Sequence, residues 1–181
     1  MSLAYRLKNR DEIKDILKKA IEENYFDSLL GLFENKDGLI PALNITKKTD
    51  DIDRLFVVPP VMPVQASRVI SNIKFTENNL KTVCVIKPCE MRAVVDLVKL
   101  KQIVPDNLFF ISMDCPGVYE LIDYKNDVNS GINISEEINK KLDNFEDISS
   151  KRYACSICDK FVPKLSDLRI RGFGKEIFLE A

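Results

Sequence analysis

The chain has 181 residues, of which 45% are hydrophobic and 30% charged, and its formal net charge is -1. This length and composition predict one domain with a single main core, and the near-neutral charge gives no general attraction to nucleic acid or anionic lipid. No apolar run approaches the roughly 18 to 20 residues that cross a bilayer, and the charged N-terminus lacks the apolar core of a signal peptide. We therefore expect a cytoplasmic protein with no nucleic-acid partner and no membrane span.

The first predicted element is a helix. Apolar residues recur at helical spacing between positions 13 and 21, and Asn9 or Asp11 can cap the N-terminus of this helix. The apolar periodicity stops after these positions, so the helix should end near Asn24.

Two strand-like segments follow. Residues 27–33 and 38–43 predict a small β-hairpin around a turn at residues 35–38. Pro41 cannot donate a hydrogen bond to a sheet ladder, so the second strand should lie at an edge. A short buried strand is then expected at residues 55–58, before prolines that lead into a helix at about residues 64–73.

The centre of the chain predicts a strand, helix, strand unit. Residues 83–86 and 108–113 are apolar and rich in strand formers, and residues 90–101 between them place apolar side chains on one helical face. A crossover of this length joins parallel strands, so the carboxyl ends of both strands should meet at one edge of the sheet, where ligands of open α/β sheets bind. We expect an α/β fold with a mainly parallel sheet, helices on its faces and the small N-terminal hairpin. A solvated surface helix is expected at residues 135–147.

One cysteine follows each central strand. Cys89 stands in Lys-Pro-Cys-Glu and Cys115 in Asp-Cys-Pro-Gly. A proline beside each thiol suits the first turn of a helix, so both thiols are expected near helix N-termini, where the helix dipole favours the thiolate. Taken singly, each is equally well explained as a small buried apolar residue, which is common for free cysteine.

Two further cysteines, Cys155 and Cys158, form a CxxC pair. Two residues between thiols let both sulfurs face one metal or cluster from a tight loop. The chain contains no histidine, so a soft metal would have to be held by sulfur. Cys84 lies inside a predicted strand and is expected to be a core residue. The candidate metal ligands are therefore Cys89, Cys115, Cys155 and Cys158.

The residues alone leave three functions open. The same four thiolates fit an iron-sulfur cluster or a zinc ion in a non-catalytic scaffold that binds a partner. Zinc knuckles usually supply two closely spaced pairs, whereas one pair and two isolated cysteines are more typical of a cluster on a larger sheet. A thiol redox pair is the third function, but such a CxxC is expected between a strand and a helix, and here polar residues 149–152 precede it. No side chain is proposed as a proton-transferring catalyst.

Four motifs follow one another in an order found in a known family. They are Lys-Pro-Cys-Glu-Met-Arg-Ala at 87–93, Met-Asp-Cys-Pro-Gly at 113–117, Cys-Ser-Ile-Cys-Asp at 155–159 and Ser-Asp-Leu-Arg-Ile at 166–170. In this order the chain resembles the beta-subunit family of coenzyme F-420 hydrogenases and dehydrogenases, which includes formate dehydrogenase beta subunits. The resemblance covers roughly residues 10–172.

This resemblance implies an iron-sulfur flavoprotein that serves as an electron-transfer module of an oxidoreductase complex. It implies that Cys89, Cys115, Cys155 and Cys158 hold a 4Fe-4S cluster, and that electrons pass between this cluster, FAD and a hydride carrier such as coenzyme F-420 or a nicotinamide. The implied partners are other oxidoreductase subunits of hydrogenase, dehydrogenase or ferredoxin-like type. Family members are longer, so residues 1–181 fit either one small domain or a fragment of a longer chain.

The resemblance does not identify the flavin-binding residues. The Gly-x-Gly at residues 172–174 has no following helix and is expected to be a turn. Lys87, Arg92 and Arg152 flank the thiols, and they either balance the charge of a thiolate cluster or contact a flavin phosphate. Charge balance or simple exposure is the favoured interpretation, since most Lys and Arg side chains have no special partner.

Overall fold

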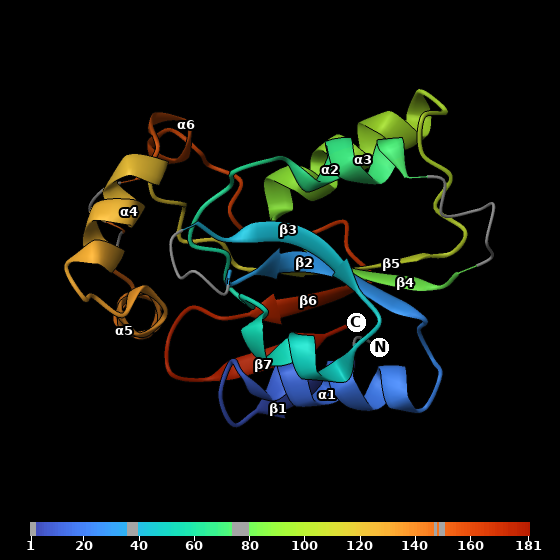
Figure 1. Cartoon of the computed structure of the whole chain (residues 1–181), viewed down its shortest axis with the longest axis horizontal. Coiled ribbons are helices and arrows are strands. Elements are labelled where there is room, and N and C mark those ends of the chain that lie inside the picture. Colours follow the sequence, from blue (N-terminus) through green and yellow to red (C-terminus); the bar gives the residue numbers. More distant parts are fainter. Residues whose placement is uncertain (1–2, 36–39, 74–79, 147, 149–150) are drawn as a thin grey trace.

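The computed structural model describes residues 3–35, 40–73, 80–146, 148 and 151–181. Within these ranges the chain forms a seven-stranded sheet, with helices on both of its faces (Figure 1). In chain order the elements are β1 Ala4–Leu7, α1 Glu12–Glu22, β2 Ser28–Phe33, β3 Ala42–Thr46, the 3-10 helix η1 Thr49–Arg54, α2 Ala66–Asn72, β4 Thr82–Ile86, α3 Pro88–Lys99, β5 Leu108–Met113, α4 Leu121–Asn129, α5 Ile134–Asp143, α6 Tyr153–Ser156, β6 Leu168–Arg171 and β7 Ile177–Glu180.

The sheet has the strand order β1-β7-β6-β5-β4-β2-β3. Strands β2, β4, β5 and β6 pair in parallel in the middle, while β3 on one side and β7 and β1 on the other pair antiparallel. In this register Ile86 lies opposite Ser112, and Ser112 lies opposite Arg169. The carboxyl ends of β4, β5 and β6 therefore meet at one edge, as the α/β prediction requires, and that prediction is confirmed.

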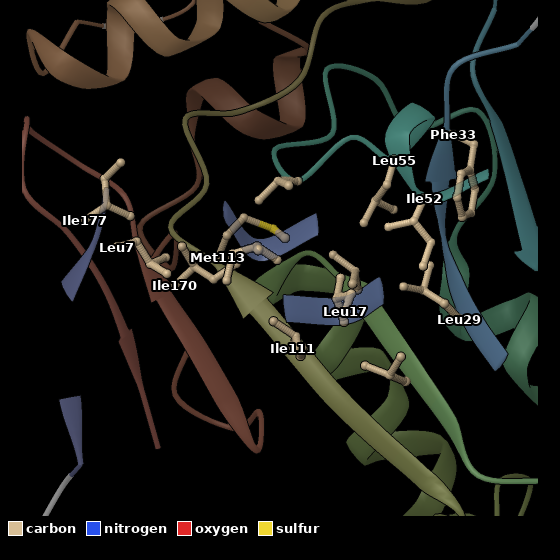
Figure 2. Close-up of a cluster of buried hydrophobic side chains, with 14 residues drawn as sticks. Leu7, Leu17, Leu29, Phe33, Ile52, Leu55, Ile111, Met113, Ile170 and Ile177 are labelled. Atoms are coloured by element: carbon tan, nitrogen blue, oxygen red, sulfur yellow. The ribbon is translucent and has the colours of Figure 1, made fainter. Parts of the chain in front are cut away.

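Hydrophobic clusters hold the helices on the two faces of the sheet. Helix α1 and η1 cover one face, where Leu17, Leu29, Ile52, Met113 and Ile170 share a cluster of buried side chains (Figure 2). Helices α2 and α3 cover the other face through a second cluster (Figure 1). Side chains alternate between the faces along each strand, and burying a large apolar side chain contributes roughly 1.5–3 kcal/mol.

A third hydrophobic cluster lies beyond the sheet, where α4 and α5 pack together (Figure 1). It contains the buried side chains of Tyr119, Ile138 and Leu142. Helix α4 is missing from the sequence prediction because its apolar residues give only a weak helical pattern, and Ile122 is 74% exposed. Among the described residues, none of the helices combines the length and apolar character needed to span a membrane.

The N-terminal helix and the edge position of β3 are confirmed. The side chain of Asn9 accepts a hydrogen bond from the backbone N–H of Glu12 at 2.9 Å, and Asn24 has a φ of 60° just after α1. Strands β2 and β3 are antiparallel as predicted, with β3 outermost, but β3 spans Ala42–Thr46 rather than residues 38–43, so Pro41 lies before the strand. Strand β2 also pairs with β4 and so belongs to the main sheet. Most of the predicted turn at residues 35–38 lies outside the described residues.

Other predicted boundaries need correction. The strand predicted at residues 55–58 is wrong: Leu55 forms only an isolated bridge to Phe33, because η1 ends immediately before it and prolines without N–H donors follow. The helix predicted at 64–73 begins later, at Ala66. The surface helix is α5, which begins one residue earlier than predicted because Asn133 caps it, and which ends at Asp143 instead of continuing towards position 147. Position 147 itself lies outside the described residues.

Candidate metal centre

Cys89 is the second residue of α3 and lies three residues after the end of the buried strand β4. The carboxylate of Glu90 fixes this helix end: its Oε2 accepts from the backbone N–H of Lys87 at 3.0 Å. Its Oε1 accepts from the backbone N–H of Ala66 at 2.8 Å, which ties the start of α3 to the start of α2. The predicted position of Cys89 at a helix N-terminus is confirmed.

Cys115 follows β5, but no helix begins there. The next helix, α4, starts only at Leu121, because Gly117 has a φ of +102° and turns the chain away. The prediction that Cys115 lies at a helix N-terminus is therefore wrong. Instead, the backbone N–H of Cys115 donates to the carbonyl oxygen of Phe161 at 3.0 Å, which connects this loop to the segment after the CxxC pair.

Cys155 packs against the loop that contains Cys115. It lies in α6, a helix of four residues, and a Cβ atom placed on Gly117 would lie 3.4 Å from the Cβ atom of Cys155. The backbone N–H of Arg152 donates to the carbonyl oxygen of Val118 at 2.9 Å, which holds the start of α6 in place. Cys158 is exposed and lies after α6, where its N–H donates to the Cys155 carbonyl at 3.3 Å.

Three of the four candidate thiols are close enough to influence one another electrostatically. Burial raises the pKa of Cys115 to about 12, and charge at Cys89 and Cys155 acts in the same direction. Burial, followed by the carboxylate of Glu90, also raises the pKa of Cys89, and Cys155 again adds to the effect. Segments that are far apart in the chain thus bring Cys89, Cys115 and Cys155 to one edge of the fold.

These shifts contradict the expected preference for thiolates at this edge. One helix end next to Cys89 does not outweigh the cost of burying charged sulfur, so metal binding has to displace protons from the thiols. Within the described ranges, no three Cys, Asp or Glu side chains are placed closely enough to hold a metal ion. Binding of a metal would therefore require the candidate thiols to move closer together.

The composition of the donor set nonetheless fits a soft metal. Four thiols and no imidazole suit iron in a cluster or zinc. The fifth thiol, Cys84, is 0% exposed within β4, and burial raises its pKa. The prediction that Cys84 is a core residue is confirmed, and it leaves four thiols outside the interior of the sheet.

Lys87 is the basic residue most closely associated with the thiols. Its side chain is buried, and its Nζ lies 3.3 Å from Glu90 Oε2. Its charge acts to lower the pKa of both Cys89 and Cys115, against the effect of burial. This position favours the charge-balancing interpretation of Lys87 over contact with a flavin phosphate.

The other two basic residues form local contacts. Arg92 donates from Nη1 to the carbonyl oxygen of Lys160 at 2.9 Å and so connects α3 to the segment after the CxxC pair. Arg152 has its Nε 3.9 Å from Glu120 Oε1, a weak ion pair at the surface.

A buried polar network next to Cys115 was not predicted. Asp114 Oδ2 accepts from the backbone N–H of Gly172 at 3.0 Å, and Arg10 Nη2 donates to the Gly172 carbonyl at 2.5 Å. Arg10 also pairs with Asp143 at 2.8 Å. The network fixes the predicted turn after β6, in which Gly174 has a φ of +87°. No sequence pattern marks these residues, because 162 positions separate Arg10 from Gly172.

No protein-family model matches the chain. The F420-dependent formate dehydrogenase 1 subunit beta of Methanococcus maripaludis is 30% identical over 111 residues, which cover 49% of this chain and 29% of that protein. The F420-dependent formate dehydrogenase subunit beta of Methanocaldococcus jannaschii is 28% identical over 112 residues, which cover 50% of this chain and 30% of that protein. The resemblance predicted from the cysteine motifs is confirmed.

The fold also matches a solved structure. A chain of the F420-reducing [NiFe] hydrogenase complex from Methanosarcina barkeri superposes with a TM-score of 0.68 at 14% identity, over 99% of this chain and 72% of that chain. At this identity the likeness concerns the fold alone. The matched segments span less than a third of each curated relative, so the activity of a whole formate dehydrogenase beta subunit does not follow from them.

Proposed function

We propose that this chain is an electron-transfer module of an F420-dependent oxidoreductase, in which Cys89, Cys115, Cys155 and Cys158 hold a 4Fe-4S cluster and FAD binds nearby. The observation that supports it best is that Cys89, Cys115 and Cys155 gather at one sheet edge although they come from three separate elements. Core-filling cysteines have no reason to collect where strands end. The similarity to beta subunits of F420-dependent formate dehydrogenases points to the same class of protein.

In this proposal the sheet and the CxxC segment have different tasks. Strands β4 and β5 hold Cys89 and Cys115 in place, and the exposed Cys158 completes the ligand set from the surface. Lys87 offsets the negative charge that four thiolates bring to the edge. When bound, the cluster supplies one-electron exchange and the flavin supplies the change between one- and two-electron steps, while the protein sets position and potential.

We also propose that the CxxC segment contacts another oxidoreductase subunit, such as a hydrogenase, dehydrogenase or ferredoxin-like protein. Large apolar side chains surround this pair, and Tyr153, Ile157, Phe161 and Leu165 are between 45% and 78% exposed. Lys160 is exposed among them. Exposed apolar side chains bordered by charge are typical of protein interaction sites, and the cation favours an acidic partner.

Metal analysis of the intact chain tests the cluster. Protein purified without oxygen and reconstituted with iron and sulfide should contain about four iron atoms per chain and show the broad visible absorption of iron bound to sulfur. Cys84→Ala is the matched control, since this buried thiol lies within β4, and it should keep the iron. Cys89→Ser and Cys115→Ser should lose the iron.

Two results would contradict the cluster. A colourless protein that holds a single zinc ion through the same four thiols would support the scaffold function. If Cys89→Ser and Cys115→Ser kept full electron-transfer activity, and Cys155 and Cys158 were still oxidised and reduced reversibly, the chain would be a thiol redox protein.

A further inference from the structure

A hollow of about 410 Å³ lies between the first turn of α3 and residues 159–165, the segment that joins the CxxC pair to β6. We call it the α3 groove. Its apolar lining consists of Pro88 and Met91 from α3 and of Val162, Pro163 and Leu165 from the segment. The two prolines and Met91 are buried, whereas Val162 is 39% and Leu165 is 52% exposed. The groove therefore combines a buried apolar base with an exposed apolar edge.

Two hydrogen bonds hold the walls of the α3 groove in place. Arg92 Nη1 donates to the carbonyl oxygen of Lys160 at 2.9 Å, and the backbone N–H of Cys115 donates to the carbonyl oxygen of Phe161 at 3.0 Å. Pro163 restricts the segment further, because its ring fixes the backbone φ angle. A groove with walls that are already fixed loses little conformational entropy when a ligand binds, so this one is suited to binding.

The α3 groove carries an excess of positive charge. Arg92, Lys160 and Lys164 line it, against one carboxylate, that of Asp159. The two lysines and Asp159 are exposed, so their charges lie at the rim. By contrast, the hollow beside α1 is lined by more carboxylates than lysines. The excess of cations at the α3 groove favours a ligand that brings carboxylates to the rim.

The volume of the α3 groove limits what can enter it. One turn of an α-helix with its side chains is about 10 Å across and about 5.4 Å long, so it occupies at least about 420 Å³. A single helical turn would therefore fill the whole groove. An extended chain points alternate side chains to opposite sides, so it can insert apolar side chains and keep acidic ones at the rim. The groove fits an extended segment better than a helix.

We propose that the α3 groove binds an extended segment of a partner protein in which apolar side chains alternate with carboxylates. The apolar side chains enter between Met91 and Leu165, and the carboxylates contact Lys160 and Lys164. The inference rests on the proposed function for the identity of the partner as an oxidoreductase subunit, and it deepens the proposed contact by naming a site and a ligand chemistry. The segment binds beside the candidate metal centre, because Met91 lies two residues after Cys89 in α3.

Peptide binding to the 181-residue chain tests the α3 groove. The probe is a short fluorescein-labelled peptide in which leucine and glutamate alternate, and fluorescence anisotropy measures its affinity. It should bind at least about tenfold more tightly than a peptide in which lysine replaces glutamate, or one in which serine replaces leucine, because each control peptide lacks one of the two interactions. Its affinity should fall as the salt concentration rises.

Two variants of the chain separate the two interactions. Lys164→Glu should weaken the leucine–glutamate peptide about tenfold, and Lys19→Glu, the same change at an exposed lysine of α1 on the opposite face of the sheet, should not. Leu165→Ser should also weaken the peptide about tenfold, whereas Leu100→Ser, at a 66% exposed leucine just after α3, should leave its affinity unchanged. All four side chains are exposed, so the variants should fold like the wild type.

Three results would overturn the inference. Equal affinities for the leucine–glutamate and serine–glutamate peptides would mean that the α3 groove attracts charge alone. Tighter binding of oligothymidylate than of the leucine–glutamate peptide would mean that the cations serve a nucleic acid. Peptide affinities unchanged by both Lys164→Glu and Leu165→Ser would place the binding elsewhere on the chain.

Iron content distinguishes this inference from the proposed function. If the reconstituted chain holds iron but neither Lys164→Glu nor Leu165→Ser changes peptide binding, the groove assignment alone fails. If no iron is incorporated and both variants weaken peptide binding, the cluster fails and the peptide site remains.

Discussion

The two pairs of thiols differ in how the fold holds them. Cys89 and Cys115 lie two or three residues after the ends of β4 and β5, two neighbouring strands that are largely buried. Cys155 and Cys158 lie in and after a four-residue helix whose surroundings expose Tyr153 and other large apolar side chains. The sheet therefore sets the positions of Cys89 and Cys115, which form the sheet half of the candidate metal centre. The CxxC segment supplies the other two candidate ligands, Cys155 and Cys158, which form the CxxC half. The predictions below test the two halves separately.

The largest effect should come from Glu90, which supports the sheet half. Glu90→Ala removes the acceptor for two backbone N–H groups and leaves the buried Lys87 ammonium without its partner. Breaking a buried ion pair in this way costs about 3–5 kcal/mol. Urea denaturation of the metal-free protein should show this loss.

The matched control for Glu90 lies on the same helix. Asp96→Ala breaks the exposed pair with Lys99 and should change the free energy of unfolding by less than about 0.5 kcal/mol. An equal loss in both variants would mean that Glu90 contributes no more than an ordinary surface charge.

Lys87 should affect the potential of the centre more than the fold. Lys87→Gln breaks the same buried pair, but the Glu90 carboxylate keeps its two backbone donors, so the loss of stability should be smaller than in Glu90→Ala. An added electron is stabilised by a nearby cation, so the variant should lower the midpoint potential by about 60 mV, which is a tenfold change in a one-electron equilibrium. Redox titration of the reconstituted protein measures it. Lys99→Gln, an exposed cation on the same helix, should leave the potential unchanged.

The elements predicted correctly from the sequence are those that follow one another directly in the chain. The unit from β4 to β5 was predicted because one strand, one helix and one strand follow each other with clear apolar patterns, and Cys89 was placed with it. It failed at Cys115, where Pro116 suggested a helix but Gly117 turns the chain instead. Because the Cys115 loop meets the CxxC segment through contacts between distant residues, no pattern around Cys115 could show its conformation.

Strands β1 and β7 could not be predicted for a related reason. Each has four residues, too few to show alternation, and Ala4 pairs with Glu180 at the opposite end of the chain. The same separation conceals the contacts of Arg10 and Asp114 with Gly172. These contacts were therefore visible only once the sheet was assembled.

The pH dependence of stability should depend on Cys115. Its pKa rises from 9.0 to about 12 on folding, so the folded state binds more protons than the unfolded state between these values. Stability is therefore complete below pH 9 and falls as the pH rises towards 12, by at most about 1.4 kcal/mol per pH unit for this group. Urea denaturation of metal-free protein at pH 8 and pH 10 should show the fall.

Cys115→Ser supplies the control for this slope, since a serine hydroxyl does not titrate in this range. The variant should retain the part of the slope that comes from the other buried thiols and from Tyr119 and Tyr124, whose pKa values burial also raises. A slope identical to that of the wild type would show that the Cys115 thiol ionises as it does in the unfolded chain.

The smallest effect is expected in the CxxC half. Ile157 is 69% exposed, so Ile157→Ser should change the free energy of unfolding by less than about 0.5 kcal/mol and leave the iron content unchanged. Ile138→Ala, which truncates a side chain that is 2% exposed, should cost about 2–5 kcal/mol in the same urea experiment. A comparable loss in both variants would show that the CxxC segment packs as firmly as the core. In that case the two halves would no longer differ, and Cys155 and Cys158 would be held as rigidly as Cys89 and Cys115.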